Sequence, residues 1–183
     1  MGSHGRAVAG ASALRSRRAF VAACFSAATH PLFAATSAPA SSEDERFMRM
    51  ALDEARRADF PFGAVIIRDG RVLARGRNLG RTNDDPTAHG EMVAIRRCLV
   101  RHGSKGLRGS TLYTTGEPCA MCTGAILWSR VGRLVYAAPV DRLATRIDQI
   151  MVSSADLAAK ASFVAISITG GVLADEAMAL FAK

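Results

Sequence analysis

The chain has 183 residues, of which 49% are apolar and 22% are charged, and this composition is typical of a folded globular protein. Four cysteines are too few for a disulfide scaffold of this length, and the lack of any run of 18 apolar residues excludes a polytopic membrane protein. The formal net charge of +8 is unevenly spread. Residues 1–42 contain four arginines and no acid, so residues 43–183 carry only +4, less than a dedicated nucleic-acid-binding protein usually shows.

Residues 1–42 are typical of a targeting leader, which we expect to stay outside the fold. The paired arginines Arg17-Arg18 precede a mildly apolar stretch at 19–29, and an Ala/Ser-rich tract then ends in Ala38-Pro39-Ala40. Paired arginines in this position favour a twin-arginine export signal and therefore a periplasmic protein. Two alternatives stay open: an organellar transit peptide, or an upstream extension of a cytoplasmic protein that begins near Met48 or Met50.

The first half of the body predicts a helix, a β-hairpin and a second helix. Residues 44–58 place apolar side chains near helical spacing, after serines and acids that suit a helix start. Two short apolar runs, 62–67 and 72–77, flank Asp69-Gly70, which is a strong hairpin signal. A polar loop over 78–87 then leads to a helix over 88–101. We expect that helix to present Met92, Ile95 and Leu99 on one face and to bury Cys98 as an apolar filler.

The second half of the body predicts alternating strands and helices. Strands are expected at 110–115, 133–137 and 163–168, and helices at 119–129, with Pro118 at its start, and at 172–182. Residues 138–162 show little pattern beyond a helical turn at 155–160. Because strands alternate with helices after the opening hairpin, we predict one α/β domain over residues 43–183, with helices on both faces of the sheet.

Two short motifs place metal-binding side chains at the starts of predicted helices. His89-Gly90-Glu91 opens one helix, and Pro118-Cys119-Ala120-Met121-Cys122 opens another, with Cys119 30 residues after His89. A C-x-x-C step lets two sulfurs reach one ion from a single helical turn, and zinc suits two thiolates with one imidazole. Cys98 lies on the opposite side of its helix from His89, so no obvious fourth protein ligand exists.

Three protein ligands with an open position are typical of a catalytic zinc that activates water. We therefore predict one zinc ion on His89, Cys119 and Cys122, with the carboxylate of Glu91 beside it to carry a proton. A redox pair, a structural metal site and a non-catalytic metal or thiol module are the alternatives. The occurrence of both motifs in this order argues against them, and a merely structural site has no use for Glu91.

H-x-E followed by P-C-x-x-C resembles the signature of the zinc nucleobase deaminases. The resemblance to this cytidine-deaminase-like superfamily covers roughly residues 44–182. The segments similar to its branch of tRNA adenosine deaminases and guanine deaminases are Phe62-Gly63-Ala64-Val65-Ile66, Arg77-Asn78, residues 86–91 and residues 115–126.

The resemblance implies a three-layer α/β/α sandwich with a five-stranded mixed sheet, and a homodimer. It also implies that His89, Cys119 and Cys122 bind one zinc ion per chain, that Glu91 is the proton shuttle, and that Asn78 forms a hydrogen bond with the base. The implied reaction is the hydrolytic removal of an exocyclic amine as ammonia.

The choice of substrate rests on finer similarities. Residues 61–65 and 126–130 are more similar to guanine deaminases, whereas residues 118–122 and 168–176 are more similar to the tRNA enzymes. The basic C-terminal helix of the tRNA enzymes is absent, because residues 174–183 contain two acids and only one base. We therefore favour a free nucleobase or nucleoside, guanine or a related amino-heterocycle first, with a tRNA-specific adenosine deaminase as the alternative. Nucleic acid is then not expected as a partner, and we interpret the arginine clusters as solvated surface.

Three further side chains are candidates for substrate contact. Phe62 and Trp128 offer apolar or stacking surface, with core packing as the alternative for both. Asp148, within the segment of unclear pattern, is a candidate for contact with a ring N–H. Gly90 replaces the alanine that is more usual between the metal-binding histidine and the glutamate, and we expect the missing methyl group to widen the pocket.

Overall fold

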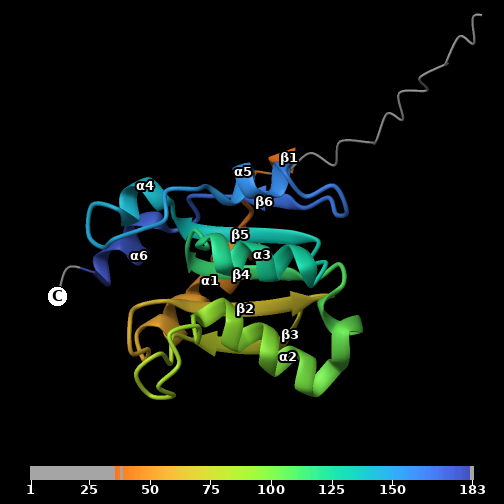
Figure 1. Ribbon diagram of the computed structural model, residues 1–183, viewed down its shortest axis with the longest axis horizontal. Helices are drawn as coiled ribbons and strands as arrows, with labels where there is room; N and C mark the ends of the chain where they lie inside the picture. The colour runs from red at the N-terminus through yellow and green to blue at the C-terminus, as the bar shows by residue number, and fades with distance from the viewer. Residues whose placement is uncertain (1–35, 38, 182–183) are drawn as a thin grey trace, which may run out of the picture.

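The computed structural model describes residues 36–37 and 39–181, so most of the predicted leader lies outside the described residues (Figure 1). The strands are β1 (Thr36–Ser37), β2 (Gly63–Arg68), β3 (Arg71–Arg77), β4 (Thr111–Gly116), β5 (Arg133–Ala138) and β6 (Ser167–Thr169). The helices are α1 (Ser42–Ala55), α2 (Gly90–Leu107), α3 (Ala120–Trp128), α4 (Val140–Leu143), α5 (Ser154–Ala159) and α6 (Ala174–Ala179).

The sheet is mixed, as predicted, and its strand order is β1-β6-β5-β4-β2-β3. Strand β2 runs antiparallel to both β3 and β4, whereas β4, β5 and β6 are parallel to one another. The five strands β2 to β6 match the predicted number. The two-residue strand β1 adds to the edge beside β6, and Ser41 and Ser42 begin α1, so the expectation that all of residues 1–42 stay outside the fold does not hold for these four residues.

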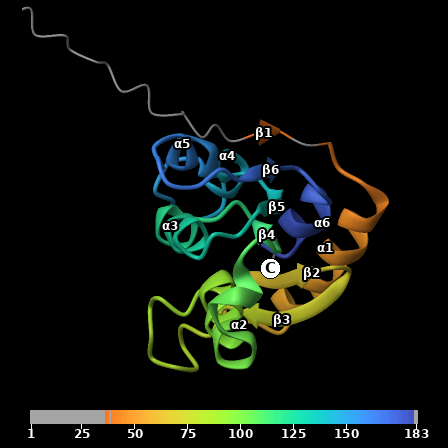
Figure 2. The same cartoon turned by 90° about the vertical axis from the view of Figure 1, so that its right-hand side faces the viewer.

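Helices cover both faces of the sheet (Figure 2). Along β2, Ala64 and Ile66 face the core beneath α2, α3 and α5, whereas Val65 and Ile67 face the core beneath α1 and α6. Successive strand residues point to opposite faces, so a central strand that is buried on both sides is apolar throughout. This explains the uninterrupted apolar run that predicted β2 and gives the three-layer α/β/α sandwich.

The start of α1 is fixed by a capping box and an ion pair. The hydroxyl of Ser41 accepts a hydrogen bond from the backbone N–H of Asp44, and the carboxylate of Asp44 accepts one from the backbone N–H of Ser41. Asp44 also pairs with Arg133 of β5 at 2.7 Å and accepts a hydrogen bond from the hydroxyl of Tyr113 in β4. The helix is thereby tied to two neighbouring strands of the sheet.

A close approach between α2 and the sheet sets the position of the residues at the start of this helix. A Cβ atom on Gly76 of β3 would collide with the α2 backbone at Gly90 and Ala94. A Cβ atom on Gly90 would lie 3.0 Å from the carbonyl oxygen of Phe62 and 3.3 Å from the Cα of Gly63. The missing methyl group of Gly90 therefore serves the packing of α2 against β2, and the expectation that it widens the pocket stays a prediction.

Most predicted elements are present, although several differ from the prediction in extent or in the face that they bury. The buried face of α2 carries Ala94, Ile95 and Cys98, whereas Leu99 is 41% exposed, so the predicted face is wrong at that position. The last strand is confined to Ser167–Thr169 and begins four residues later than predicted. The closing helix is shorter than predicted, and the sequence pattern gave no indication of α4.

Candidate active site

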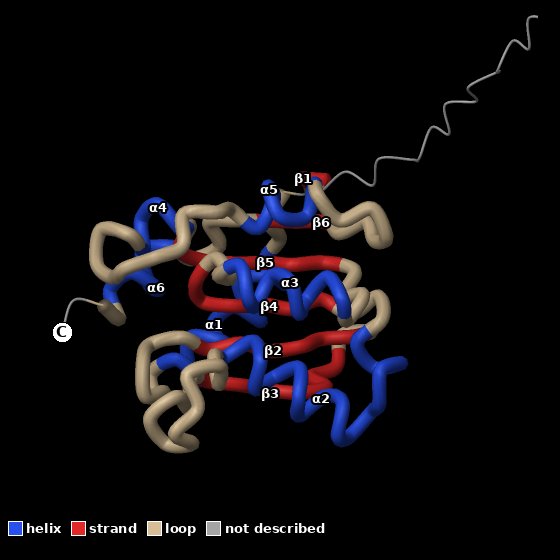
Figure 3. The backbone as a smooth tube through the Cα atoms, viewed as in Figure 1, coloured by secondary structure: helices blue, strands red, loops and turns tan. Residues whose placement is uncertain are grey.

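The three predicted metal ligands come together at the starts of α2 and α3. Figure 3 shows the loops that lead into these helices at one end of the sheet. His89 is the N-cap of α2 and Cys119 the N-cap of α3, and neither side chain caps its own helix. Cys122 lies in the first turn of α3 and is fully buried. The three ligand atoms lie within 4.8 Å of one another.

The distances between these atoms fit a tetrahedral zinc site. Ligand atoms at about 2.3 Å (sulfur) and about 2.0–2.1 Å (nitrogen) from a tetrahedral ion lie roughly 3.6 Å apart. The Nδ1 of His89 lies 3.7 Å from the Sγ of Cys119 and 3.6 Å from the Sγ of Cys122. Two soft sulfurs and one imidazole are also the donor set that zinc prefers. Among the described residues, these three are the one group of His, Cys, Asp and Glu side chains with such spacing.

The three ligand groups are linked by protons when no metal ion is bound. The hydrogen bond from Cys122 lowers the pKa of Cys119 to about 4, although burial opposes this effect. The same contact and burial raise the pKa of Cys122, because its thiol is the donor in the hydrogen bond to Cys119 and keeps its proton. The hydrogen bond with Cys119 raises the pKa of His89. A metal-free site therefore holds protons between its ligands, which a metal ion has to displace on binding.

Glu91 stands beside the ligands as a buried carboxyl group. It is 4% exposed, and one of its oxygens accepts a hydrogen bond of 3.1 Å from the hydroxyl of Thr114 in β4. Burial raises the pKa of Glu91, so its carboxyl group can both accept and release a proton closer to neutral pH than an exposed glutamate can. Thr114 fixes the orientation of the group.

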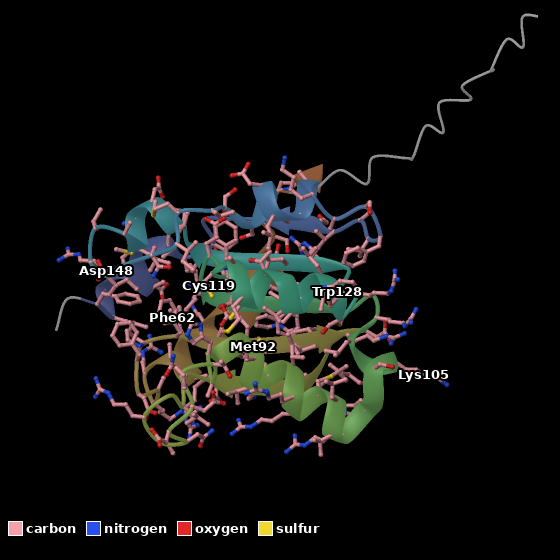
Figure 4. All side chains as sticks on the ribbon, viewed as in Figure 1. Phe62, Met92, Lys105, Cys119, Trp128 and Asp148 are labelled. Atoms are coloured by element: carbon pink, nitrogen blue, oxygen red, sulfur yellow. The ribbon has the colours of Figure 1, made fainter. Side chains whose placement is uncertain are left out.

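A cavity of about 40 Å³ connects these residues, and its lining consists of Phe62, His89, Glu91, Glu117, Cys119 and Gln149. This volume exceeds the roughly 10–15 Å³ that one water molecule needs. Figure 4 shows Phe62 on the same side of the molecule as Cys119. The ring of Phe62 packs against Phe60 and against Phe181 near the C-terminus, with ring centroids 5.7 and 5.3 Å apart. Phe62 is thus an apolar wall of the cavity, and its contact with substrate stays a prediction.

Two cavity residues were not predicted. Glu117 is 5% exposed and accepts hydrogen bonds from the backbone N–H of Val140 (2.9 Å) and from the N–H (2.8 Å) and hydroxyl (3.0 Å) of Ser154. It therefore joins the start of α3 to the starts of α4 and α5. Gln149 comes from the segment between these two helices. The position of Glu117 directly before Pro118-Cys119 was an available signal, whereas nothing in the local sequence marked Gln149.

Three other candidates lie outside the cavity lining. Trp128 is 76% exposed and stacks on Phe163, with ring centroids 4.4 Å apart, at the opposite end of α3 from Cys119 (Figure 4). This exposure contradicts the core packing that was the alternative for Trp128, and its contact with substrate stays a prediction. Asp148 is exposed, and its neighbour Gln149 takes the place in the cavity. Asn78 is 9% exposed; its backbone N–H donates to the carbonyl of Phe62, and its side-chain oxygen accepts from the N–H of Gly80.

Comparison with known families decides the class of this site. Residues 41–138 match the model of the cytidine and deoxycytidylate deaminase zinc-binding region, which is more than half of the chain. The chain belongs to this family. Members of the family hydrolyse a C–N bond and release an amino group. The zinc site of this chain is the group formed by His89, Cys119 and Cys122.

Relatives within the family fall into two groups. The chain is 46% identical over 101 residues to the tRNA-specific adenosine deaminase of Agrobacterium fabrum, across 53% of this chain and 66% of that protein. It is 50% identical over 78 residues to the guanine deaminase of Bacillus subtilis, across 43% of this chain and 50% of that protein. The matches thus span two thirds or less of these curated relatives.

Solved structures show the same division. One is a structure from a study of A-to-I editing by tRNA:A34 deaminases (TM-score 0.65, 35% identity, 74% of this chain and 98% of the other). Another is the guanine deaminase of Nitrosomonas europaea (TM-score 0.68, 28% identity, 81% of this chain and 85% of the other). Across the described residues, no helix is both long and apolar enough to cross a membrane.

Proposed function

We propose that this chain is a zinc-dependent hydrolytic deaminase that converts adenosine to inosine in tRNA. The observation that carries the chemistry is the buried carboxyl group of Glu91 beside three metal ligands. The substrate is supported by relatives: proteins named as tRNA-specific adenosine deaminases are 38–46% identical to this chain over about 100 residues in five bacteria. This proposal reverses the preference for a free base that the sequence alone favoured.

The residues of the chain have distinct roles in the proposed reaction. Zinc on His89, Cys119 and Cys122 would lower the pKa of a water molecule so that it attacks the base at neutral pH. Glu91 takes a proton from the attacking water and gives it to the departing amine, which leaves as ammonia. The hydroxyl of Thr114 holds the carboxyl group of Glu91 in place for both transfers. Phe62 provides an apolar surface for the ring.

Guanine is the second candidate substrate, favoured by a specific observation. Helix α6 carries Asp175 and Glu176 and contains no lysine or arginine, so it offers no cation to an RNA backbone. The 50% identity to the guanine deaminase of Bacillus subtilis supports the same alternative.

Product analysis on one preparation separates the candidates. The purified full chain, loaded with zinc, is incubated with a tRNA anticodon stem-loop that contains adenosine at the wobble position, and separately with guanine, guanosine and cytosine. Inosine in the stem-loop without ammonia from guanine supports the first candidate. Ammonia from guanine without inosine in the RNA overturns the tRNA substrate and supports guanine. If zinc is bound and no substrate reacts, both are overturned.

Localisation bears on the same choice, because an enzyme that leaves the cytoplasm does not meet tRNA. Export through the predicted twin-arginine signal is a proposal that rests on residues outside those described. Fractionation of cells that express the full chain with a C-terminal tag tests it: recovery in the periplasm favours guanine, and recovery in the cytoplasm favours tRNA. The proposed homodimer is tested by light scattering during gel filtration.

A further inference from the structure

The structure brings together two arginine clusters that are separate in sequence. Strand β3 forms one edge of the sheet and lies between α1 and α2 (Figure 2). A cleft of about 480 Å³ runs along this edge, and its charged lining residues are Glu54 of α1, Arg75 and Arg77 of β3, and Arg97 and Arg101 of α2. This cleft is larger than the cavity at the metal ligands and shares no residue with it.

The positive charge in the cleft is not balanced by protein groups. Glu54 is the one carboxylate among the lining residues, and it already pairs with Arg57 (2.7 Å) and Arg77 (3.3 Å). Within residues 39–181, no carboxylate lies within ion-pair distance of Arg75, Arg97 or Arg101. The contrast is Arg96, the neighbour of Arg97, which pairs with Asp85 at 3.2 Å.

The arrangement of these arginines is also unfavourable for the stability of the protein. Arg97 and Arg101 lie four residues apart on α2, a spacing at which like charges destabilise a helix. The guanidinium of Arg97 is fixed toward the edge strand, because it donates a hydrogen bond of 3.0 Å to the carbonyl of Arg75. The Nε of Arg77 is buried and has no hydrogen-bond partner among the described residues. An unsatisfied buried donor beside guanidinium groups that have no carboxylate partner indicates an anionic ligand.

We propose that the cleft between α1, β3 and α2 binds phosphate groups. Guanidinium forks match phosphate oxygens in two-pronged hydrogen bonds, and several arginines along one edge fit a ligand with more than one phosphate. Two sources supply this chemistry: the backbone of an RNA strand, or a small phosphorylated molecule. The RNA source rests on the proposed function, because the cleft would then hold the strand whose base is deaminated. The competing explanation is that the arginines keep the exposed edge of β3 from pairing with another chain.

Binding measurements on the full chain with two probes test this proposal. The probes are a fluorescent single-stranded RNA of about 12 nucleotides and inorganic pyrophosphate, each titrated at about 50 mM and about 200 mM salt. The test variant is R97Q/R101Q, in which both substituted side chains are exposed. The matched control is R46Q/R49Q, which removes the same charge from exposed positions three residues apart on α1, where both arginines are paired with glutamates.

We expect R97Q/R101Q to bind one of the probes about tenfold more weakly, or worse, than the wild-type and control proteins do. Loss confined to RNA, with a shallower salt dependence, assigns the cleft to a nucleic-acid backbone. Loss of saturable pyrophosphate binding assigns it to a small phosphorylated ligand. Equal affinity of all three proteins for both probes, or binding of neither probe, overturns the proposal.

Zinc content should be the same in all three proteins, and so should the rate of deamination at a saturating concentration of whichever substrate the wild-type protein accepts. Failure of the phosphate site is therefore distinguishable from failure of the deaminase. If the wild-type protein binds pyrophosphate but never forms inosine in RNA, the cleft stands and the tRNA substrate falls.

Discussion

Replacement of Glu117 by glutamine tests how the cavity is held together. The carboxylate accepts three hydrogen bonds, from the N–H of Val140 and from the N–H and hydroxyl of Ser154. A glutamine amide keeps one oxygen, which can still serve both donors of Ser154. Its NH₂ group then faces the N–H of Val140, and two donors oppose each other at a separation of about 2.9 Å. An unsatisfied buried donor costs about 1–3 kcal/mol, which for a domain of this size lowers the midpoint of thermal unfolding by roughly 3–10 °C.

The same substitution should impair substrate binding. Val140 and Ser154 start the two helices that flank Gln149, a residue of the cavity lining. Once the start of α4 is released, we expect a higher KM and retained zinc. The control is S154A, which removes one hydroxyl donor and leaves the carboxylate in place, so its loss of stability should be smaller. Calorimetry and steady-state kinetics of the three proteins supply the readouts. An E117Q protein with unchanged unfolding midpoint and unchanged KM would refute this role of the carboxylate.

Three further predictions follow from packing and charge. Burial raises the pKa of Asp44, but its hydrogen bonds from Arg133 and from neighbouring groups outweigh this effect and lower the pKa to about 2. The carboxylate therefore adds about 2 kcal/mol to the free energy of unfolding above roughly pH 4, and this contribution is lost as the pH falls toward 2. In urea denaturation, D44N should accordingly be less stable than the wild type at pH 7 and should approach it at low pH. In the same assay, the free energy of unfolding of G76A should fall by about 3 kcal/mol or more, because the added methyl group collides with the α2 backbone. The free energy of unfolding of G124A should rise by about 1 kcal/mol, because the space around this position in α3 is open. Removal of zinc by a chelator should abolish turnover reversibly, and zinc titrations should show weaker binding at lower pH because protons compete for the imidazole and thiolates; a pH-independent affinity would contradict this.

Features encoded over a few residues could be predicted from the sequence. Asp69 and Gly70 both have positive φ, which a two-residue hairpin turn requires, so the dipeptide alone located the hairpin. The metal ligands could be predicted in the same way. The start of a helix places His89 and Glu91, or Cys119 and Cys122, at a fixed spacing that does not depend on the rest of the fold. The burial of Cys98 followed from its chemistry.

Features that depend on distant partners could not be predicted in this way. The hydrogen-bond partners of Glu117 lie 23 and 37 residues away, and no local pattern connects them. Leu99 fits the apolar spacing of α2, yet Ala94 and Cys98 are buried in this helix whereas Leu99 is exposed. Trp128 has a large apolar side chain, but it is the last residue of α3 and is exposed at the surface.

The central claim is that a metal ion and the carboxyl group of Glu91 act together on water, and one variant tests it most directly. Glutamine at position 91 keeps the shape of the side chain and can still meet the hydroxyl of Thr114, but it cannot carry a proton. We predict that E91Q binds one zinc ion per chain, as the wild type does, and forms product at least about 100-fold more slowly on whichever substrate the wild type accepts. An E91Q protein that retains zinc and the full rate of ammonia release would contradict the account.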